Sequence, residues 1–127
     1  MAHIALTEAE WKIMLKLWEK SPQTMMELTR SLEAETGWTK HTVITMLKRM
    51  QQKGTVHICE DGPVKTYTPA VEKERVKREQ TQTLLDRLFA GRASLLMSEL
   101  VSGGALSAEE LDQLRRLIEK QSKNNAN

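Results

Sequence analysis

The chain has 127 residues, with 19 lysines and arginines against 17 aspartates and glutamates, which gives a formal net charge of +2. This length fits one or two small folding units. Such a nearly balanced charge does not by itself mark a protein that binds nucleic acid or a membrane surface, so any signal of that kind has to be local.

Cysteine content and hydropathy narrow the cellular setting. Cys59 is the single cysteine, which excludes an internal disulfide and is typical of a reducing compartment. The N-terminus lacks the features of a signal peptide, and no apolar run approaches the ~18 residues of a membrane span. We therefore expect a cytoplasmic protein with no membrane insertion.

Three short helices are predicted in the first half of the chain. Two of them open with capping boxes, Thr7 with Glu10 and Thr24 with Glu27, in which each residue's side chain bonds the other's backbone amide. The third is expected over residues 39 to 53, because Thr39 can cap it and a glycine at position 54 suits a left-handed residue after its end.

A β-hairpin is predicted after the third helix. The segments "TVHIC" and "VKTYTP" are rich in β-forming residues and flank the turn-forming "EDGP". Three helices followed by a hairpin is the element order of a winged helix-turn-helix. We predict a mainly α fold with a winged-helix DNA-binding domain over residues 1–71, a helical dimerisation region over 72–121 and a disordered tail over 122–127.

The second half carries apolar stripes on three predicted helices: a charged run ending at Gly91, the short "RASLLMSELV", and a last helix that Ser107 and Glu110 can cap. About 55 residues are few for an independent core. We therefore expect a homodimer, and the alternative is that these helices fold back on the winged helix of their own chain. The expected dimerisation residues are Leu84, Leu85, Leu88, Leu95, Leu96, Leu100, Leu111, Leu114, Leu117 and Ile118.

The third helix combines local positive charge with a free face. Residues 37 to 54 contain four lysines or arginines and no acid. Turning each residue 100° about the axis places Val43, Met46, Leu47 and Met50 on one side, with polar residues opposite. Lysine, arginine and threonine suit phosphates and base edges in a major groove. The alternative is an ordinary solvated face. The candidate DNA-binding residues, including the helix N-terminus and one lysine of the hairpin, are Thr39, Lys40, His41, Thr42, Thr45, Lys48, Arg49 and Lys65.

Several motifs also resemble the penicillinase-repressor family, which includes the BlaI, MecI and CopY regulators. They are "WTKHTVITMLKRMQQKG", "GPVKTYTPAV", "LLDRLFAGRASLL" and "LSAEELDQLRRLIE", and the similarity runs from about Leu6 to Glu119. The resemblance implies a homodimeric transcriptional repressor that binds a palindromic double-stranded operator. It also implies a membrane sensor protease system that responds to β-lactams and leads to cleavage in the dimerisation region. The family's DNA contacts map onto His41, Thr42, Thr45, Arg49 and, on the wing, Lys65.

Two departures from the family pattern limit this resemblance. The β-lactam-responsive members are cut at an Asn-Phe bond, and this sequence has Ser98, Glu99 and Leu100 in the corresponding segment. The copper-responsive members carry CxC motifs near the C-terminus, which are absent here, so copper sensing through thiolates is excluded. The inducing signal, the operator sequence and the regulated genes are not indicated by the sequence.

The remaining histidines and the cysteine do not indicate a specific function. His57 and Cys59 are expected on one face of a strand, where they suit either a metal or redox role or plain packing, and two ligands do not close a metal site. His3 is expected in a frayed terminus. We find no motif of an enzyme and predict no metal, cofactor or catalytic residue. Two other functions stay open: a ligand-responsive winged-helix regulator with its effector between the two halves, and a protein-interaction module that never contacts DNA.

Overall fold

The computed structural model describes residues 4 to 125. The chain divides into two compact units, Met1–Thr81 and Gln82–Asn127. None of the described helices is long and apolar enough to cross a membrane. The elements are α1 (Glu8–Glu19), β1 (Gln23–Thr24), α2 (Met25–Thr36), α3 (Lys40–Lys53), β2 (Val56–Cys59), β3 (Thr66–Pro69), α4 (Lys73–Phe89), α5 (Ala93–Ser102) and α6 (Ala108–Asn125).

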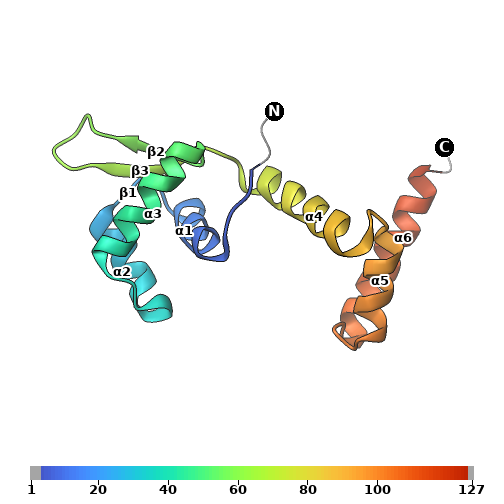
Figure 1. The fold of residues 1–127 in the computed structure, drawn as a ribbon. Helices are drawn as coiled ribbons and strands as arrows, with labels where there is room; N and C mark the ends of the chain where they lie inside the picture. The colour runs from blue at the N-terminus through green and yellow to red at the C-terminus, as the bar shows by residue number, and fades with distance from the viewer. Residues whose placement is uncertain (1–3, 126–127) are drawn as a thin grey trace. The chain divides into compact units, whose positions relative to one another are not determined.

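The first unit is a winged helix, as predicted. Strands β2 and β3 form an antiparallel hairpin with Val56 opposite Pro69, and its loop extends away from the helices (Figure 1). A third strand, β1, pairs with the other edge of β3, giving the order β1-β3-β2. β1 was not predicted, because two residues are too few to show the alternation that identifies a strand.

The helix starts agree with the capping boxes. Thr7 Oγ1 accepts from the Glu10 amide at 3.1 Å, and Glu10 Oε1 accepts from the Thr7 amide at 2.9 Å. The Thr24 and Glu27 pair forms the same two hydrogen bonds, at 3.2 and 3.0 Å. These bonds satisfy amides that have no partner inside a helix, and they fix where α1 and α2 begin.

Two glycines bound the segment that contains α3. Gly37 follows α2 with φ 68° and Gly54 follows α3 with φ 86°, both left-handed. In that region a side chain is strained, so glycine allows both helices to end sharply. The cap on α3 is also as predicted, because Thr39 Oγ1 accepts from the Thr42 amide.

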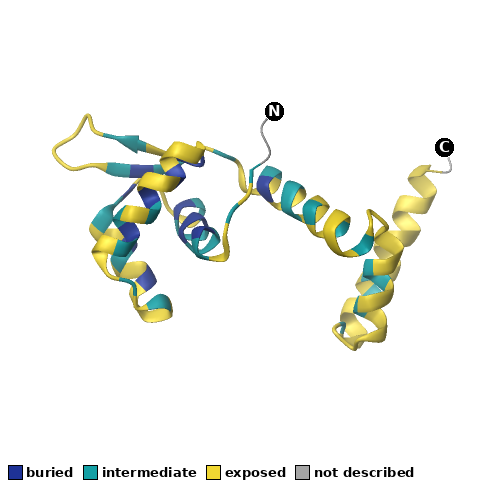
Figure 2. Ribbon diagram, viewed as in Figure 1, coloured by how far each residue is buried: buried dark blue, intermediate teal, exposed yellow. Residues whose placement is uncertain are grey.

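The hydrophobic core lies among the three helices and the sheet (Figure 2). Each fully buried aliphatic side chain contributes roughly 1.5–3 kcal/mol of transfer free energy. The aromatic pair Trp11 and Trp18 packs edge to face at 5.5 Å on α1, and the Trp18 indole donates to the Val71 carbonyl at 3.0 Å. The buried hydrophobic residues of this core are Ile13, Met14, Leu17, Leu28, Leu32, Val43, Leu47, Met50, Val56 and Tyr67.

The start of α4 belongs to the first unit, which therefore extends past the predicted boundary at residue 71. Val76 is fully buried. The side chain of Gln80 donates to the Leu6 carbonyl at 3.2 Å, and the Ile4 amide donates to Glu79 Oε2 at 3.0 Å. The sequence did not indicate this attachment, because it involves one apolar position and two polar side chains in an otherwise charged helix.

The second unit contains the end of α4 together with α5 and α6. Among its described residues no hydrophobic side chain is fully buried, as the absence of dark blue in Figure 2 shows. Ser107 and Glu110 cap α6 as predicted, at 3.1 and 3.0 Å. The disordered tail predicted from residue 122 is corrected: α6 continues through Asn125, and Lys123 in its last turn is favourable for the helix dipole. Residues 126 and 127 lie outside the described residues.

A buried carboxylate joins α1 to the end of α3. Glu10 is 1% exposed, and both its carboxylate oxygens accept from Lys53 Nζ, at 2.8 and 3.0 Å. Burial raises the pKa of Glu10, but the hydrogen bonds from Lys53 and Thr7 and the charge of Lys53 together lower it below its ordinary value of 4.5. The carboxylate is therefore ionised at neutral pH and holds the last residue of α3 against the first turn of α1.

Replacing Glu10 tests this connection. We expect Glu10→Gln to lower the free energy of unfolding by ~1–3 kcal/mol at pH 7, because it removes charge-assisted hydrogen bonds from a buried site. The pKa of Glu10 is lowered by folding, so its contribution is present above pH 4.5 and is lost as the pH falls through the lowered pKa. The difference from the parent chain should shrink accordingly in urea unfolding at decreasing pH. Glu8→Gln, an exposed change in the same turn, is the control, and an equal loss in both variants would contradict this account.

Candidate nucleic-acid interface

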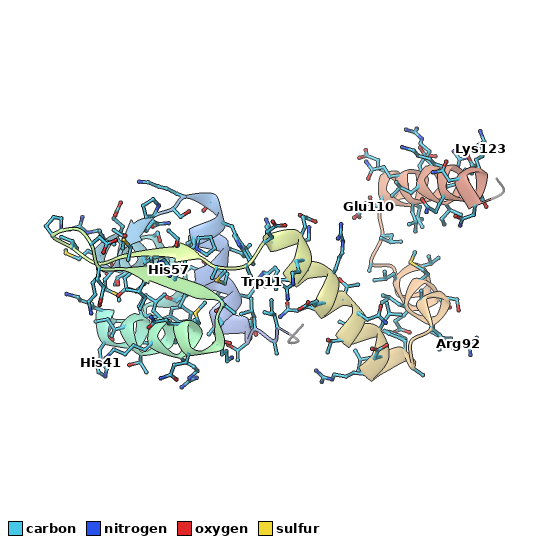
Figure 3. The ribbon with its side chains drawn as sticks, turned by 90° about the horizontal axis from the view of Figure 1, so that it is seen from above. Trp11, His41, His57, Arg92, Glu110 and Lys123 are labelled. Atoms are coloured by element: carbon cyan, nitrogen blue, oxygen red, sulfur yellow. The ribbon has the colours of Figure 1, made fainter. Side chains whose placement is uncertain are left out.

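The outer face of α3 has the composition predicted for it. His41, Thr45, Lys48 and Arg49 are exposed and Thr42 is half-buried, whereas the opposite face is buried in the core. Figure 3 shows His41 on α3 and His57 on the neighbouring hairpin. The division arises because the apolar positions of the helix recur at helical spacing, so burying them turns the polar positions outward.

Two backbone amides in the first turn of α3 are left without a partner inside the helix. The Thr42 amide donates to Thr39 Oγ1 at 3.3 Å, and the Val43 amide donates to the Thr39 carbonyl at 3.1 Å. The Lys40 and His41 amides, in the first turn, have no partner inside the helix. Because that turn contains no acid, the helix dipole and these two amides favour an anion such as a phosphate.

The threonine hydroxyls of α3 are already engaged. Thr45 Oγ1 donates to the His41 carbonyl at 3.0 Å, and the Thr39 and Thr42 hydroxyl oxygens lie 3.2 Å apart. A hydroxyl that donates to the preceding turn keeps its lone pairs for accepting a hydrogen bond. Its rotamer is also fixed, which fixes the direction of the methyl group. Thr45 therefore offers an ordered methyl group and an acceptor on the exposed face.

The cations of this surface differ in how they are paired. Lys48 and Arg49 form no ion pair with any described residue, whereas Lys53 is held by Glu10. On the wing, Lys65 pairs with Glu60 at 3.2 Å, and both side chains are well exposed. An exposed pair of this kind is worth little in water, so Lys65 can exchange Glu60 for another anion at small cost.

The structure brings the wing lysine close to the helix. Lys40 and Lys48 of α3 and Lys65 of the wing line one groove of about 510 Å³ between the two elements. The groove's apolar lining residues, among them Ile44 and Val64, were not part of the sequence prediction. Their signal was weak, because Ile44 lies on the flank of the helical wheel and Val64 is an ordinary β-forming residue beside the predicted turn.

The hairpin residues His57 and Cys59 form no metal site within the part of the chain described. The Cys59 thiol faces Asp61, with Sγ 3.9 Å from Oδ2, and His57 is exposed. No group of three or more His, Cys, Asp or Glu side chains that could hold a metal occurs among residues 4 to 125. His3 lies outside the described residues.

The predicted dimerisation residues keep much of their apolar surface in water. Leu88 is 64% exposed and Leu117 63% exposed. Val101, which the prediction omitted, is half exposed on α5. The remaining predicted residues are exposed or half-buried: Leu84, Leu85, Leu95, Leu96, Leu100, Leu111, Leu114 and Ile118.

The segment that corresponds to the cleavage site of the β-lactam-responsive family members lies inside a helix. Ser98, Glu99 and Leu100 are all within α5, where the backbone forms helical hydrogen bonds. Proteolysis concentrates in exposed loops and termini, and a helix has to open locally before a protease can bind it. Cleavage at this position would therefore require α5 to unfold in part.

Comparison with known proteins agrees with this arrangement. The family model described as penicillinase repressor matches residues 6–120. The penicillinase repressor of Bacillus licheniformis is 25% identical over 115 residues, covering 91% of this chain and 90% of that protein. The methicillin resistance regulatory protein MecI of Staphylococcus aureus strain N315 is 23% identical, covering 91% of this chain and 94% of MecI.

Two solved structures share the fold. The solution structure of monomeric Bacillus licheniformis BlaI in complex with the blaP half-operator is 27% identical with a TM-score of 0.51, covering 57% of this chain and 89% of that one. The oxidised form of Escherichia coli MarR is 22% identical with a TM-score of 0.51, covering 91% of this chain and 74% of that one, and shows the fold alone. Since the family model matches nearly the whole sequence and the winged helix matches in structure, the chain belongs to the penicillinase repressor family.

Proposed function

We propose that this chain, a winged-helix transcriptional repressor of the penicillinase repressor family, binds operator DNA as a homodimer with α3 in the major groove. The observation that carries the proposal is the division of α3: one face is buried in the core, and the other is exposed, basic and free of acids. The structure of the related BlaI with a half-operator supports it.

Phosphate contacts position the protein on the DNA and supply most of the affinity. The free amides at the start of α3 suit one phosphate, and Lys48 and Arg49 suit others because no described carboxylate neutralises them. Lys65 joins them from the wing by leaving Glu60. Each phosphate that a cation neutralises releases counterions, so the affinity falls as salt rises.

Three residues on the outer face of the first half of α3 would recognise the bases. His41 can donate to or accept from a base edge, and Thr42 offers a hydroxyl. Thr45 presents the methyl group that its bond to the His41 carbonyl holds in place, and this suits the methyl of thymine. These three residues would therefore determine which operator is bound.

The second unit supplies the dimer. It buries no hydrophobic side chain fully within its own described residues, although α4, α5 and α6 all carry exposed leucines. A symmetric partner would cover these stripes, because the same surface on two copies is self-complementary. Two-fold symmetry in turn predicts an inverted-repeat operator with half-sites one or two helical turns of about 10 bp apart. Blocking RNA polymerase at such a site would repress the gene.

An exposed arginine with no ion pair is the first residue to test. We expect Arg49→Ala to lower the affinity for DNA upstream of the chain's own gene by ~10-fold or more, because it removes one cation from the interface. Fluorescence anisotropy at several salt concentrations measures the affinity and the salt dependence, which should become shallower. Arg78→Ala removes an exposed arginine from α4 and is the matched control. Unchanged affinity of Arg49→Ala at about 150 mM salt would exclude Arg49 from the interface.

Base recognition by the Thr45 methyl predicts a coupling between protein and DNA. Thr45→Ser keeps the hydroxyl and removes the methyl, so the operator affinity should fall ~4-fold, the value of one buried methyl group. Replacing the contacted thymine by uracil should have the same effect on the parent chain and little further effect on Thr45→Ser. Additive losses at every thymine of the half-site would show that the methyl groups do not meet.

The dimer is tested on the full chain with two substitutions in α6, one on its apolar stripe and one on the opposite face. Leu117→Asp places a charge on the apolar stripe, and we expect a monomer in analytical ultracentrifugation with operator affinity lowered ~100-fold, because two half-sites no longer bind as one unit. Lys123→Asp introduces an aspartate on the face opposite the stripe, and this variant should stay dimeric. A chain truncated after Gly91 should likewise be monomeric, and a dimer in that truncation would locate the interface elsewhere.

A further inference from the structure

The groove between α3 and the wing has the size of a small-molecule site. Its volume of about 510 Å³ falls within the roughly 300–1,000 Å³ typical of ligand pockets. Both elements belong to the first compact unit, so the groove does not depend on the second. The groove combines an apolar floor with cations, and the residues that matter here are Ile44, Val64, Tyr67, Lys40, Lys48 and Lys65.

Phosphate binding does not account for the apolar floor. Val64 is 58% exposed at the tip of the wing, and Ile44 is half-buried on the flank of α3. A phosphate needs cations and amides and gains nothing from exposed aliphatic side chains. A ligand with an apolar body would remove this surface from water, at about 25 cal/mol for each Å² that it covers.

The charge of the groove selects an anion. Three ammonium groups line it, and those of Lys40 and Lys48 form no ion pair with any described residue. Lys65 pairs with the carboxylate of Glu60, and because both side chains are exposed this pair is easily exchanged. An anionic group placed there would therefore meet several cations at once.

A tyrosine hydroxyl supplies a directed donor. Tyr67 lines the groove and is 6% exposed, and its hydroxyl forms no hydrogen bond with any described residue. No fully buried side-chain oxygen or nitrogen in the described chain lacks a partner, so the Tyr67 hydroxyl is reached from outside. Burial raises the pKa of Tyr67 and Glu60 raises it further, against the opposing charge of Lys65, so the hydroxyl stays protonated at neutral pH and can donate.

From these observations we infer that the groove between α3 and the wing binds a small apolar monocarboxylate. Its carboxylate would accept from the Tyr67 hydroxyl and pair with the lysine ammonium groups, and its apolar body would cover Ile44 and Val64. If the proposed function holds, the ligand releases the operator, because Lys48 and Lys65 cannot bind a carboxylate and DNA phosphates together. Binding to the free protein does not depend on that function.

The probe is para-tert-butylbenzoate, titrated into the isotopically labelled full chain and followed by amide NMR. We expect saturable shifts at Ile44, Val64 and Tyr67 with millimolar or tighter affinity. The neutral para-tert-butylbenzamide lacks the negative charge, and the small anion acetate lacks the apolar body. Each should therefore bind ~10-fold more weakly. Equal binding of the benzamide, or no saturable shift at these residues, would overturn the inference.

Two variants examine the residues of the groove. Tyr67→Phe should weaken benzoate binding ~10-fold, and Val64→Ser, on the exposed wing, should weaken it ~4-fold. Neither residue belongs to the proposed DNA contacts, so both variants should bind the operator as the parent chain does and resist its release by the benzoate. Benzoate affinity unchanged in both would overturn the inference.

Operator binding is measured on the same samples without benzoate, so the two proposals are separated. A chain that binds benzoate in the groove but no DNA would refute the proposed function and keep the groove. A chain that binds DNA and shows no saturable benzoate site would refute the groove proposal and keep the proposed function.

Discussion

The hydrogen-bonded pair of Glu10 and Lys53 holds in place the helix whose outer face is the proposed DNA interface. A carboxylate that is 1% exposed needs a partner, and the partner is the last residue of α3. The same carboxylate also caps α1 through Thr7. The start of one helix and the end of another are thus fixed by three hydrogen bonds to one group. The pair holds the end of α3 against α1, and the buried apolar face of α3 sets which of its side chains face outward.

The two faces of α3 have separate roles. Val43, Leu47 and Met50 are buried, so the helix cannot turn without exposing them. On the outer face Thr45 is bonded to its own helix, which orders its side chain before any ligand arrives. An interface that is already ordered loses less conformational entropy on binding, so the affinity of the contacts is retained rather than offset. The stability of the core therefore contributes directly to recognition.

The sequence was sufficient for features that depend on local chemistry and insufficient for those that depend on long-range pairing. Capping boxes, left-handed glycines and the apolar stripe of α3 are local, and each agrees with the structure. The pairing of β1 with β3 and the contact of Glu10 with Lys53, 43 residues apart, cannot be inferred from spacing. The tail was mistaken for disorder because its polar residues bury nothing, although a helix can continue from α6 without burial.

The two units differ in how completely they bury their apolar residues. The first unit buries its own apolar residues, so its core can stabilise it without a partner. The second unit leaves Leu88 and Leu117 largely exposed. If a second copy covers them, the order of the second unit and the dimer become one equilibrium, which depends on the concentration of the chain. Operator binding inherits this dependence, because two half-sites are bound tightly only when two winged helices are linked. The weakly packed half would then decide when the well-packed half can act.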